Sequence, residues 1–401
     1  MLFRSALSPL FRFPGLGRNA ALDQFVADNG LIAMSVDIDS RDWVRQSPGE
    51  VLERTLARIE ARGKGIVLMH DIQPRTVAML PDLLRALKQK GYRIVHVTGT
   101  NGKTTTTHFL AAAVRAGLDP GGTRVVHNAD GANLHGGITA ALSDNRTATW
   151  AIIETDERVV ADMVRLGHPE VLVLLNFSRD QLDRHHEIKA LGRSWRNALE
   201  AAGDGGPVVI ANADEPLVVW AAQTAREVVW VDTATTWTQD ASLCPQCGAL
   251  LLREEPDSTD AQGEWHCSGC DLAQPKASYR VVDGQIIDPD GNAFDPRLQV
   301  PGAFNISNAA CAMAAAAQLG VPSATAIAGM RTVTAPAGRF ATAQFGDTTA
   351  RLLLAKNPAG WAEALPLAQS DVVILAIDSA AADGRDVSWL WDVEYEQLAG
   401  R

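Results

Sequence analysis

The sequence lacks a surplus of basic residues. Lys and Arg number 36 against 47 Asp and Glu, which gives a formal net charge of -11 and a pI near 5.3. Nucleic-acid binders usually present a basic surface, so this balance argues against wholesale binding of a phosphate backbone. The sequence also lacks an uninterrupted run of about 18 apolar residues, the length that a membrane-spanning helix needs. Neither a nucleic-acid partner nor a transmembrane segment is therefore expected.

The first residues lack the apolar core of a signal peptide. Arg4, Pro9, Arg12 and Pro14 interrupt the opening segment. Because no h-region survives these interruptions, a cytoplasmic location is expected.

Cysteine is scarce, and four of the five cysteines form two Cys-x-x-Cys pairs, Cys244 with Cys247 and Cys267 with Cys270. Each pair turns tightly enough to aim two thiolates at one ion, and two such pairs suit a tetrahedral Zn²⁺ site. Four thiolates leave no open coordination position, so the predicted role is structural. A redox role and four unligated thiols are the alternatives. Cys311 lies in an alanine-rich run and is interpreted as a small buried hydrophobic residue.

A glycine loop follows the β-rich run at residues 92–98 and precedes a stretch of helical spacing. Its glycines would let backbone N–H groups close around phosphate oxygens, and the helix N-terminus adds a positive end. Lys103 would supply a cation to the outer phosphates, and Thr104 a hydroxyl to Mg²⁺. An ordinary turn before a helix is the alternative. The predicted nucleotide-binding residues are Gly99, Thr100, Asn101, Gly102, Lys103, Thr104 and Thr105.

Acidic residues stand at the end of a second apolar run, at Glu154, Asp156 and Glu157. In a doubly wound sheet this strand end lies near the loop after the first strand. Carboxylates there suit Mg²⁺, although a solvated strand end has the same composition.

The loop resembles the short form found in the Mur ligase and folylpolyglutamate synthase superfamily, because Val97 stands where the Walker pattern has its first glycine. This resemblance implies that Glu154 is the magnesium ligand, with the other two carboxylates as substitutes. It also implies that Asn176 and the Asp-x-Leu-Asp-Arg run at 180–184 lie near the phosphates. Asn305 and Asn308 would lie beside the adenine; a helix cap and a surface amide are the alternatives.

Later segments resemble the MurT family over about residues 95–401. The cysteine pairs follow the strand at 208–212, and the chain ends with Lys356-Asn357-Pro358-Ala359-Gly360 and an Asp-Gly-Arg-Asp-x-Ser-Trp-x-Trp-Asp run at 383–392. The resemblance implies ATP-dependent amidation of the D-glutamate α-carboxylate of lipid II to D-isoglutamine, through an acyl phosphate. Ammonia would come from a GatD-type glutaminase partner, whose His an Asp of this chain orients. Asp392 is the match for that Asp, with Asp386 second.

The first 94 residues resemble the C-terminal half of a NodB-type polysaccharide deacetylase, in the segments 35–43 and 65–81. The motifs that supply metal ligands in that family are absent from the sequence. Without a metal, His70 and Asp37 have nothing to assist, so deacetylation is not expected. The run at 91–97 fits either the last deacetylase strand or the first strand of the ATPase sheet.

A chain of 401 residues is expected to form two or three domains. The predicted fold class is α/β: a deacetylase-like segment at 1–94, a Mur ligase central domain with a mainly parallel sheet at 95–334, and an incomplete MurT C-terminal domain at 335–401. A zinc ribbon is inserted at 240–276. Expected ligands are ATP, Mg²⁺ and structural Zn²⁺. Expected partners are the GatD-type subunit, in a heterodimer, and lipid II, with peripheral contact at the inner membrane face. Amino-acid addition, carbohydrate deacetylation and a scaffold that only binds its partner are the alternatives.

Overall fold

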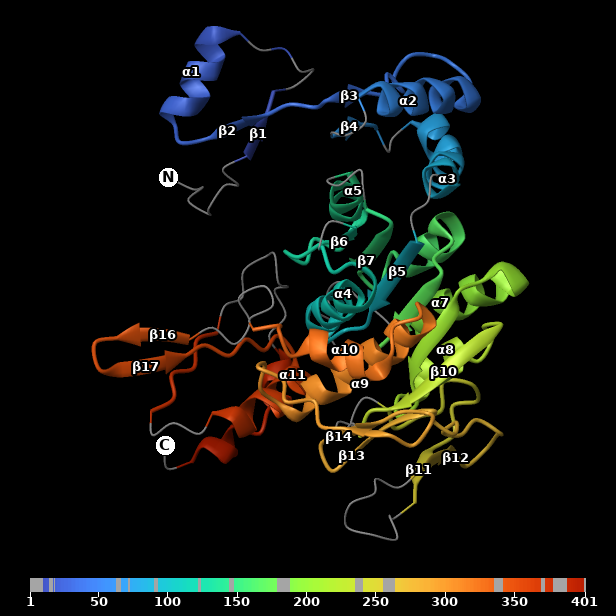
Figure 1. Ribbon diagram of the computed structural model, residues 1–401, viewed down its shortest axis with the longest axis vertical. Helices are drawn as coiled ribbons and strands as arrows, with labels where there is room; N and C mark the ends of the chain where they lie inside the picture. Colours follow the sequence, from blue (N-terminus) through green and yellow to red (C-terminus); the bar gives the residue numbers. More distant parts are fainter. Residues whose placement is uncertain are drawn as a thin grey trace. The chain divides into compact units, whose positions relative to one another are not determined.

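The computed structural model divides the chain into two compact units, Met1–Ala86 and Leu87–Arg401. Figure 1 colours the chain from the N-terminal unit in blue to the C-terminal segment in red. No helix among the residues that the structure describes is long and apolar enough to cross a membrane. The domain boundaries predicted at 94/95 and 334/335 stay predictions. The structure describes residues 10–13, 17, 19–62, 66–70, 73–89, 93–121, 124–143, 148–178, 188–234, 241–254, 264–334, 342–368, 372–377 and 388–399.

The N-terminal unit combines helices with two short parallel strand pairs, β1 with β2 and β3 with β4. Helix α2 begins with a capping box, in which Glu50 Oε2 accepts from Ser47 N at 2.8 Å and Ser47 Oγ accepts from Glu50 N at 3.3 Å. The elements are β1 (Leu10–Arg12), α1 (Ala20–Asp28), β2 (Ile32–Met34), β3 (Ile38–Asp39), α2 (Pro48–Arg62), β4 (Val67–Leu68) and α3 (Pro74–Gln89).

The second unit is built on a nine-stranded sheet in the order β15-β14-β13-β10-β9-β8-β5-β7-β6. Every pair from β6 to β13 is parallel, and β14 and β15 add an antiparallel edge. The mainly parallel sheet is therefore confirmed, and residues 93–97 of the run predicted at 91–97 belong to β5, which lies between β8 and β7. The strands are β5 (Arg93–Thr98), β6 (Val125–His127), β7 (Trp150–Glu154), β8 (Val171–Leu174), β9 (Val208–Asn212), β10 (Glu227–Asp232), β13 (Tyr279–Val282), β14 (Gln285–Ile287) and β15 (Ala293–Phe294).

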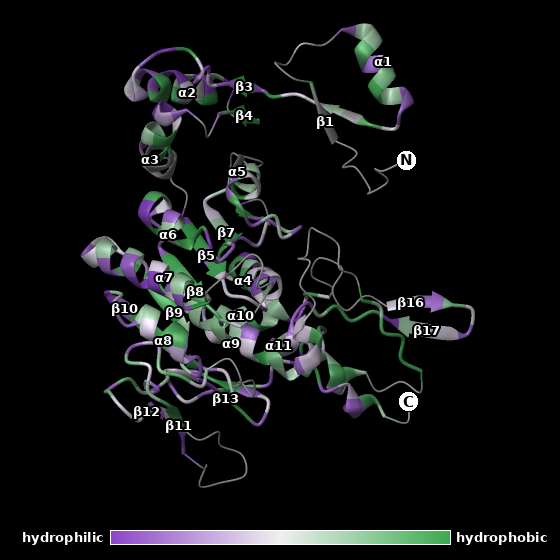
Figure 2. Ribbon diagram, turned by 180° about the vertical axis from the view of Figure 1, so that it is seen from behind, coloured by the Kyte–Doolittle hydropathy of each residue, from purple (hydrophilic) through white to green (hydrophobic). Residues whose placement is uncertain are grey.

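Helices cover both faces of this sheet, so its central strands are apolar on both sides. Val95 and Val97 of β5 pack in one cluster with helices α4, α9 and α10, whereas Leu172 of β8 packs with Trp195 of α7 in another. Side chains alternate between faces along a strand, and a sheet covered twice needs an apolar residue at nearly every position. Figure 2 shows β5, β7, β8 and β9 as hydrophobic strands. The helices are α4 (Lys103–Leu118), α5 (His135–Ser143), α6 (Val160–Asp162), η2 (Met163–Gly167), α7 (Ile188–Ala202), η3 (Gly203–Gly205), α8 (Pro216–Ala222), α9 (Ala303–Gln318) and α10 (Ser323–Met330).

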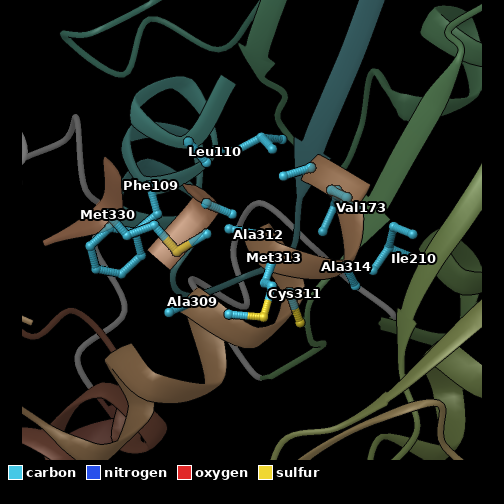
Figure 3. Packing of buried hydrophobic residues seen from close by; sticks show 14 of the residues in the cluster. Phe109, Leu110, Val173, Ile210, Ala309, Cys311, Ala312, Met313, Ala314 and Met330 are labelled. Atoms are coloured by element: carbon cyan, nitrogen blue, oxygen red, sulfur yellow. The ribbon is translucent and has the colours of Figure 1, made fainter. Parts of the chain in front are cut away.

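Small side chains allow α9 to pack closely in this core. Figure 3 shows the alanines of α9 and Cys311 in one cluster with Phe109 of α4 and Met330 of α10. Burial raises the pKa of the Cys311 thiol to about 12, with a smaller contribution from Asp214. Cys311 therefore behaves as the apolar side chain that the sequence predicts.

Two further parts belong to the second unit. A ribbon that contains the cysteine pairs includes the antiparallel strands β11 (Leu251–Arg253) and β12 (Trp265–Cys267). A C-terminal segment begins with the hairpin of β16 (Thr342–Phe345) and β17 (Thr348–Arg351). It continues with α11 (Pro358–Ala364), η5 (Leu365–Leu367), η6 (Ser388–Asp392) and η7 (Tyr395–Leu398).

A test of the core follows from Gly329 of α10. A Cβ at this position would lie 2.6 Å from the Ala112 carbonyl oxygen and 3.0 Å from Ala113 Cα of α4. Since overpacking of this kind costs about 1–3 kcal/mol, we expect Gly329→Ala to lower the free energy of unfolding by that amount in urea denaturation. The control is Gly136→Ala on α5, where nothing lies within 4 Å, and where Ala is favoured over Gly by about 1 kcal/mol. Equal stability of the two variants would contradict the close packing.

Candidate functional site

The glycine loop connects β5 to α4 and passes close to two other elements. Gly99 has a φ of +142°, and a Cβ there would lie 2.8 Å from Leu175 Cβ and 2.9 Å from Asn176 N. Gly102 has a φ of +82°, and a Cβ there would lie 2.4 Å from Asn308 Oδ1. Both positions therefore require glycine, and the loop brings the first-turn amides of α4, which have no intrahelical acceptor, to the end of the sheet. This is the geometry of an anion-binding turn.

Lys103 is 7% exposed, and its ammonium group is enclosed by acceptors. Its Nζ donates to the Gly99 carbonyl oxygen at 2.6 Å and to Glu157 Oε1 at 3.2 Å. Trp195 Nε1 in turn donates to the Glu157 carbonyl oxygen at 2.9 Å, which anchors that residue to α7. The buried cation is thus held at the loop by one carboxylate, as a buried charge requires. Glu157 serves as the partner of Lys103, a role that its sequence position did not indicate.

Thr104 and Glu154, the two residues predicted to bind magnesium, contact each other. Thr104 Oγ1 donates to Glu154 Oε2 at 2.8 Å, and Asn133 Nδ2 donates to Glu154 Oε1 at 2.9 Å. Asn128 brackets the same residue, since its Oδ1 accepts from Glu154 N and its Nδ2 donates to the Glu154 carbonyl oxygen. A hydroxyl beside a carboxylate is an oxygen donor pair that suits Mg²⁺. The arrangement fits the ion, and the two asparagines were not predicted.

Asp156, one of the two substitutes for Glu154, is engaged elsewhere. Its carboxylate accepts from Arg158 Nε at 2.7 Å and from Arg158 N at 3.0 Å. Although burial raises the pKa of the Asp156 carboxyl, the hydrogen bonds from Arg158 outweigh that effect and lower it. With Glu157 on Lys103 and Asp156 on Arg158, only Glu154 of the three candidates contacts Thr104.

A network of amides joins the loop to distant parts of the chain. Asn101 N donates to Asn176 Oδ1 at 2.8 Å, which ties the loop to the end of β8. Ser178 N donates to Thr100 Oγ1 at 3.1 Å. Asn101 and Asn357 exchange two side-chain hydrogen bonds of 3.2 Å, and Asn357 is fully buried. The C-terminal segment therefore contacts the phosphate loop directly.

Asn305 and Asn308 both lie in the first turns of α9, facing inward. Asn305 is fully buried and donates to the Pro301 carbonyl oxygen at 2.5 Å, while Asn308 Nδ2 donates to Asn305 Oδ1 at 3.1 Å. The N-cap of α9 is Gly302, and Asn308 is 7% exposed. The alternatives of a helix cap and a surface amide are therefore both wrong.

A cavity of about 340 Å³ opens beside the loop, a size that suits a small ligand. It is bounded by Asn101, Gly102 and Thr105, by the ends of β8, β9 and β10, by the start of α9 and by α11. Neither Lys nor Arg is present among the described residues that line it. Its lining includes the acidic residues Glu215, Asp283 and Glu363, so the cavity disfavours an anion. A nucleotide base, which carries no negative charge, suits it better, while the phosphates would lie at the loop and Lys103.

The four paired cysteines come together in the ribbon. Sγ of Cys244 lies 3.6 Å from that of Cys270, Sγ of Cys247 lies 3.4 Å from that of Cys267, and all four lie within 4.8 Å of one another. Tetrahedral zinc with Zn–S bonds of about 2.3 Å needs sulfur atoms about 3.8 Å apart. The cluster is thus compatible with the predicted Zn²⁺ site, and four sulfurs would complete its coordination.

Asp392 is exposed on η6, next to Trp391, which is 92% exposed. Its neighbour Val393 is buried, and the ring of Trp361 on α11 lies 5.5 Å from that of Tyr395 on η7. The turn is therefore packed on α11 while Asp392 faces outward. Asp386 and the run at 180–184 lie outside the described residues.

In the N-terminal unit the structure pairs His70 with Asp42, a residue not singled out from the sequence. His70 Nδ1 lies 2.7 Å from Asp42 Oδ1, and Thr76 Oγ1 donates to Asp42 Oδ2 at 2.6 Å. Burial raises the pKa of the Asp42 carboxyl, but hydrogen bonds from Thr76 and His70 outweigh it and lower that pKa. Asp37 instead accepts from Ile66 N at 2.8 Å.

The fold and the site define a P-loop α/β protein that carries a four-cysteine ribbon. Residues 97–316, more than half of the chain, match the Mur ligase middle domain, and residues 354–401 match the MurT ligase C-terminal domain. The chain therefore belongs to the Mur ligase family.

Two relatives are both described as lipid II isoglutaminyl synthase (glutamine-hydrolyzing) subunit MurT. That of Staphylococcus aureus (strain COL) is 29% identical over 336 residues, covering 79% of this chain and 74% of the relative. That of Streptococcus pneumoniae (strain ATCC BAA-255 / R6) is 29% identical over 373 residues, covering 86% of this chain and 82% of the relative. The MurT resemblance predicted from the sequence covered residues 95–401, which is less than 86% of the chain. The alignment with the Streptococcus pneumoniae relative must therefore include residues before 95.

Among solved structures, a pseudomurein peptide ligase type C from Methanothermus fervidus is similar, with a TM-score of 0.55 and 19% identity over 87% of this chain and 70% of that chain. At this identity the likeness shows the fold alone. Together with the family match it confirms the predicted Mur ligase fold. The resemblance of residues 1–94 to deacetylases stays a prediction.

A first test of the site concerns zinc. We expect the purified chain to hold about one Zn²⁺, because four thiolates complete one tetrahedral shell. Cys247→Ser removes one thiolate and should reduce the zinc content, measured by plasma mass spectrometry, to a small fraction of that. Cys311→Ala is the matched control, since Cys311 lies outside the cluster, and it should retain the metal. Full zinc content in Cys247→Ser would count against the four-thiolate site.

A second test uses the pH dependence of stability. His96 on β5 is 2% exposed, its Nδ1 lies 2.7 Å from Thr155 Oγ1, and burial lowers its pKa from 6.5 to about 3. Between these pH values the unfolded chain binds a proton that the folded chain does not, so the free energy of unfolding falls as pH decreases, by up to about 1.4 kcal/mol per pH unit. We expect His96→Gln to show a shallower slope in denaturation curves between pH 6.5 and 4. Parallel slopes would show that His96 is not buried in its neutral form.

Proposed function

We propose that this chain is the ATP-using subunit of an enzyme that amidates the D-glutamate α-carboxylate of lipid II to D-isoglutamine. The names of the two MurT relatives and the match of residues 354–401 to the MurT C-terminal domain support this substrate. The single observation that carries the proposal is the paired hydrogen bonding of Asn101 with Asn357. Through it a MurT-type segment closes on a phosphate loop that holds Lys103 and Thr104 in place.

The proposed reaction has two steps. A carboxylate oxygen of the substrate attacks the γ-phosphorus of ATP, ADP leaves, and an acyl phosphate forms. Ammonia then attacks the acyl carbon, phosphate leaves, and loss of a proton yields the amide. The amides of residues 102–105 and the Lys103 ammonium would stabilise the negative charge on the transferring phosphoryl group. Thr104 and Glu154 would hold Mg²⁺, which when bound neutralises phosphate charge.

The cavity would receive the adenosine portion of ATP. Asn308 places a buried amide at its edge, where its Nδ2 donates to Asn305 Oδ1 behind it, and Glu215 and Asp283 supply acceptors there. With the base in this cavity, the phosphates of the same ATP molecule would lie at the loop. A single position of ATP would then fill the cavity and place its phosphates beside Lys103.

The ammonia would come from a GatD-type glutaminase that contacts the C-terminal segment. Asp392 would orient the catalytic His of that partner, as the acid of a triad does. Its exposure beside Trp391, on a turn packed against α11, gives it a fixed position from which another protein can be reached. Amino-acid addition remains the alternative within the same family, and the cytoplasmic location stays a prediction.

Two variants separate the two active sites of the proposed complex. Co-expressed with a GatD-type glutaminase, the wild-type chain should convert lipid II to its amidated form in the presence of glutamine and ATP, measured by mass spectrometry. Lys103→Ala should lower this rate about 100-fold or more with either glutamine or ammonium chloride as nitrogen source. Asp392→Asn should lower the glutamine-dependent rate more than about tenfold and leave the ammonia-dependent rate unchanged.

The outcomes discriminate among the alternatives. Equal activity of Lys103→Ala and wild type would remove the ligase assignment. If Asp392→Asn lost activity with glutamine and with ammonium chloride alike, Asp392 would belong to the synthetase site. ATP hydrolysis that depends on an added amino acid and not on ammonia would favour amino-acid addition.

A further inference from the structure

The cysteine ribbon is inserted at the rim of the cavity. Chain leaves the sheet after β10, at Thr233 and Ala234, and returns at β13, where Ser278 N donates to the Trp230 carbonyl oxygen at 2.9 Å (Figure 1). Thr233 and Ala234 line the cavity on one side of the insertion, and Val281 lines it on the other. Both points at which the ribbon joins the sheet therefore adjoin the cavity, so a shift of the ribbon would move residues that line it.

Trp265 and Gln274 connect the ribbon to the turn after β9. Trp265 is 1% exposed, packs with Val219 and Trp220 of α8, and donates from Nε1 to the Ala213 carbonyl oxygen at 3.0 Å. Two hydrogen bonds hold Gln274 to the Trp265 backbone: Gln274 N donates to the Trp265 carbonyl oxygen at 2.8 Å, and Trp265 N donates to the side-chain Oε1 of Gln274 at 3.2 Å. The backbone of Trp265 thus fixes the side chain of Gln274.

Asp214 transmits this contact to the cavity. Its Oδ1 accepts from Gln274 Nε2 at 3.0 Å, and its Oδ2 accepts from Thr233 N at 2.9 Å and from Thr233 Oγ1 at 2.8 Å. The carboxylate is 5% exposed and therefore depends on these donors for its orientation. Thr233 Oγ1 also lies 3.1 Å from Asn212 Oδ1, and the Thr233 carbonyl oxygen accepts from Ser307 Oγ at 2.6 Å. Asn212, Thr233 and Ser307 all line the cavity.

We propose that the ribbon fixes the shape of the nucleotide cavity, with Trp265 and Gln274 as positioning residues that act through Asp214 and Thr233. The proposal rests on the proposed function, in which this cavity takes the adenosine of ATP. The cysteine cluster would hold the ribbon rigid, and the ribbon would hold the carboxylate that orders the rim. Nucleotide affinity then depends on a part of the chain that touches neither the phosphates nor the base.

The first test is the affinity of the full chain for MgATP, measured by calorimetry. Gln274→Ala removes one donor to Asp214, and we expect the dissociation constant to rise about fivefold, the weight of one hydrogen bond. Trp265→Phe keeps a six-membered aromatic ring and removes the Nε1 donor together with the five-membered ring, so we expect a rise of at least similar size. His266→Ala is the matched control, because His266 neighbours Trp265 on β12 and its side chain is 42% exposed. It should bind MgATP as the wild type does.

Further measurements distinguish positioning from a general loss of structure. Gln274→Ala should retain its zinc, and in the reconstituted enzyme the KM for ATP should rise while kcat stays unchanged. In a double-mutant cycle, Thr233→Val should weaken binding in the wild-type background and have a clearly smaller effect in Gln274→Ala, because both act through Asp214. Additive effects, or wild-type affinity in both Gln274→Ala and Trp265→Phe, would overturn the proposal. Absence of MgATP binding by the wild type would instead refute the proposed function.

Discussion

The turn between β5 and α4 can close around an anion only because residues 99 and 102 carry no side chain. A side chain at residue 99 would collide with Leu175 and Asn176, and a side chain at residue 102 would collide with Asn308. The close approach that shapes this turn therefore also holds it against the residues after β8 and against the start of α9. Lys103 and Thr104 then fall on the first turn of α4, where Glu157 and Glu154 meet them. The positions of Lys103 and Thr104 therefore depend on the close contacts that the loop backbone makes at residues 99 and 102.

Three segments far apart in the sequence complete the site around this turn. Helix α9 contributes its buried asparagines, the C-terminal segment contributes Asn357, and the ribbon supports the rim through Asp214. In the proposed reaction the nucleotide must be bound where the carboxylate and ammonia arrive, and a direct contact between the loop and the MurT-type segment supplies that proximity. Helix α11 of this segment also lines the cavity. A partner that binds the C-terminal segment would thus be separated from the nucleotide by α11.

Features that depend on local spacing were predictable from the sequence. The strand, loop and helix around Gly99 and Gly102 follow from glycine positions, and the clustering of the cysteines follows from their paired spacing. Contacts between distant residues were not: Asn101 and Asn357 are 256 positions apart, and no pattern in either segment indicates the other. From spacing alone, the roles of the carboxylates at the end of β7 were predictable only as a set, and the choice of Glu154 came from the family resemblance. The direction of each side chain decides which carboxylate contacts Thr104 and which contacts Lys103. The contact between His70 and Asp42 likewise depends on side-chain direction, and the sequence pattern did not indicate it.

The central claim is that the loop at 99–105 binds a nucleoside triphosphate through its backbone amides. Hydrogen–deuterium exchange of the full chain, with and without MgATP, measures this at the amides themselves. The account predicts slower exchange at residues 99–105 and at the start of α9, with no change in the N-terminal unit. Unchanged exchange across residues 99–105 at saturating MgATP would contradict it.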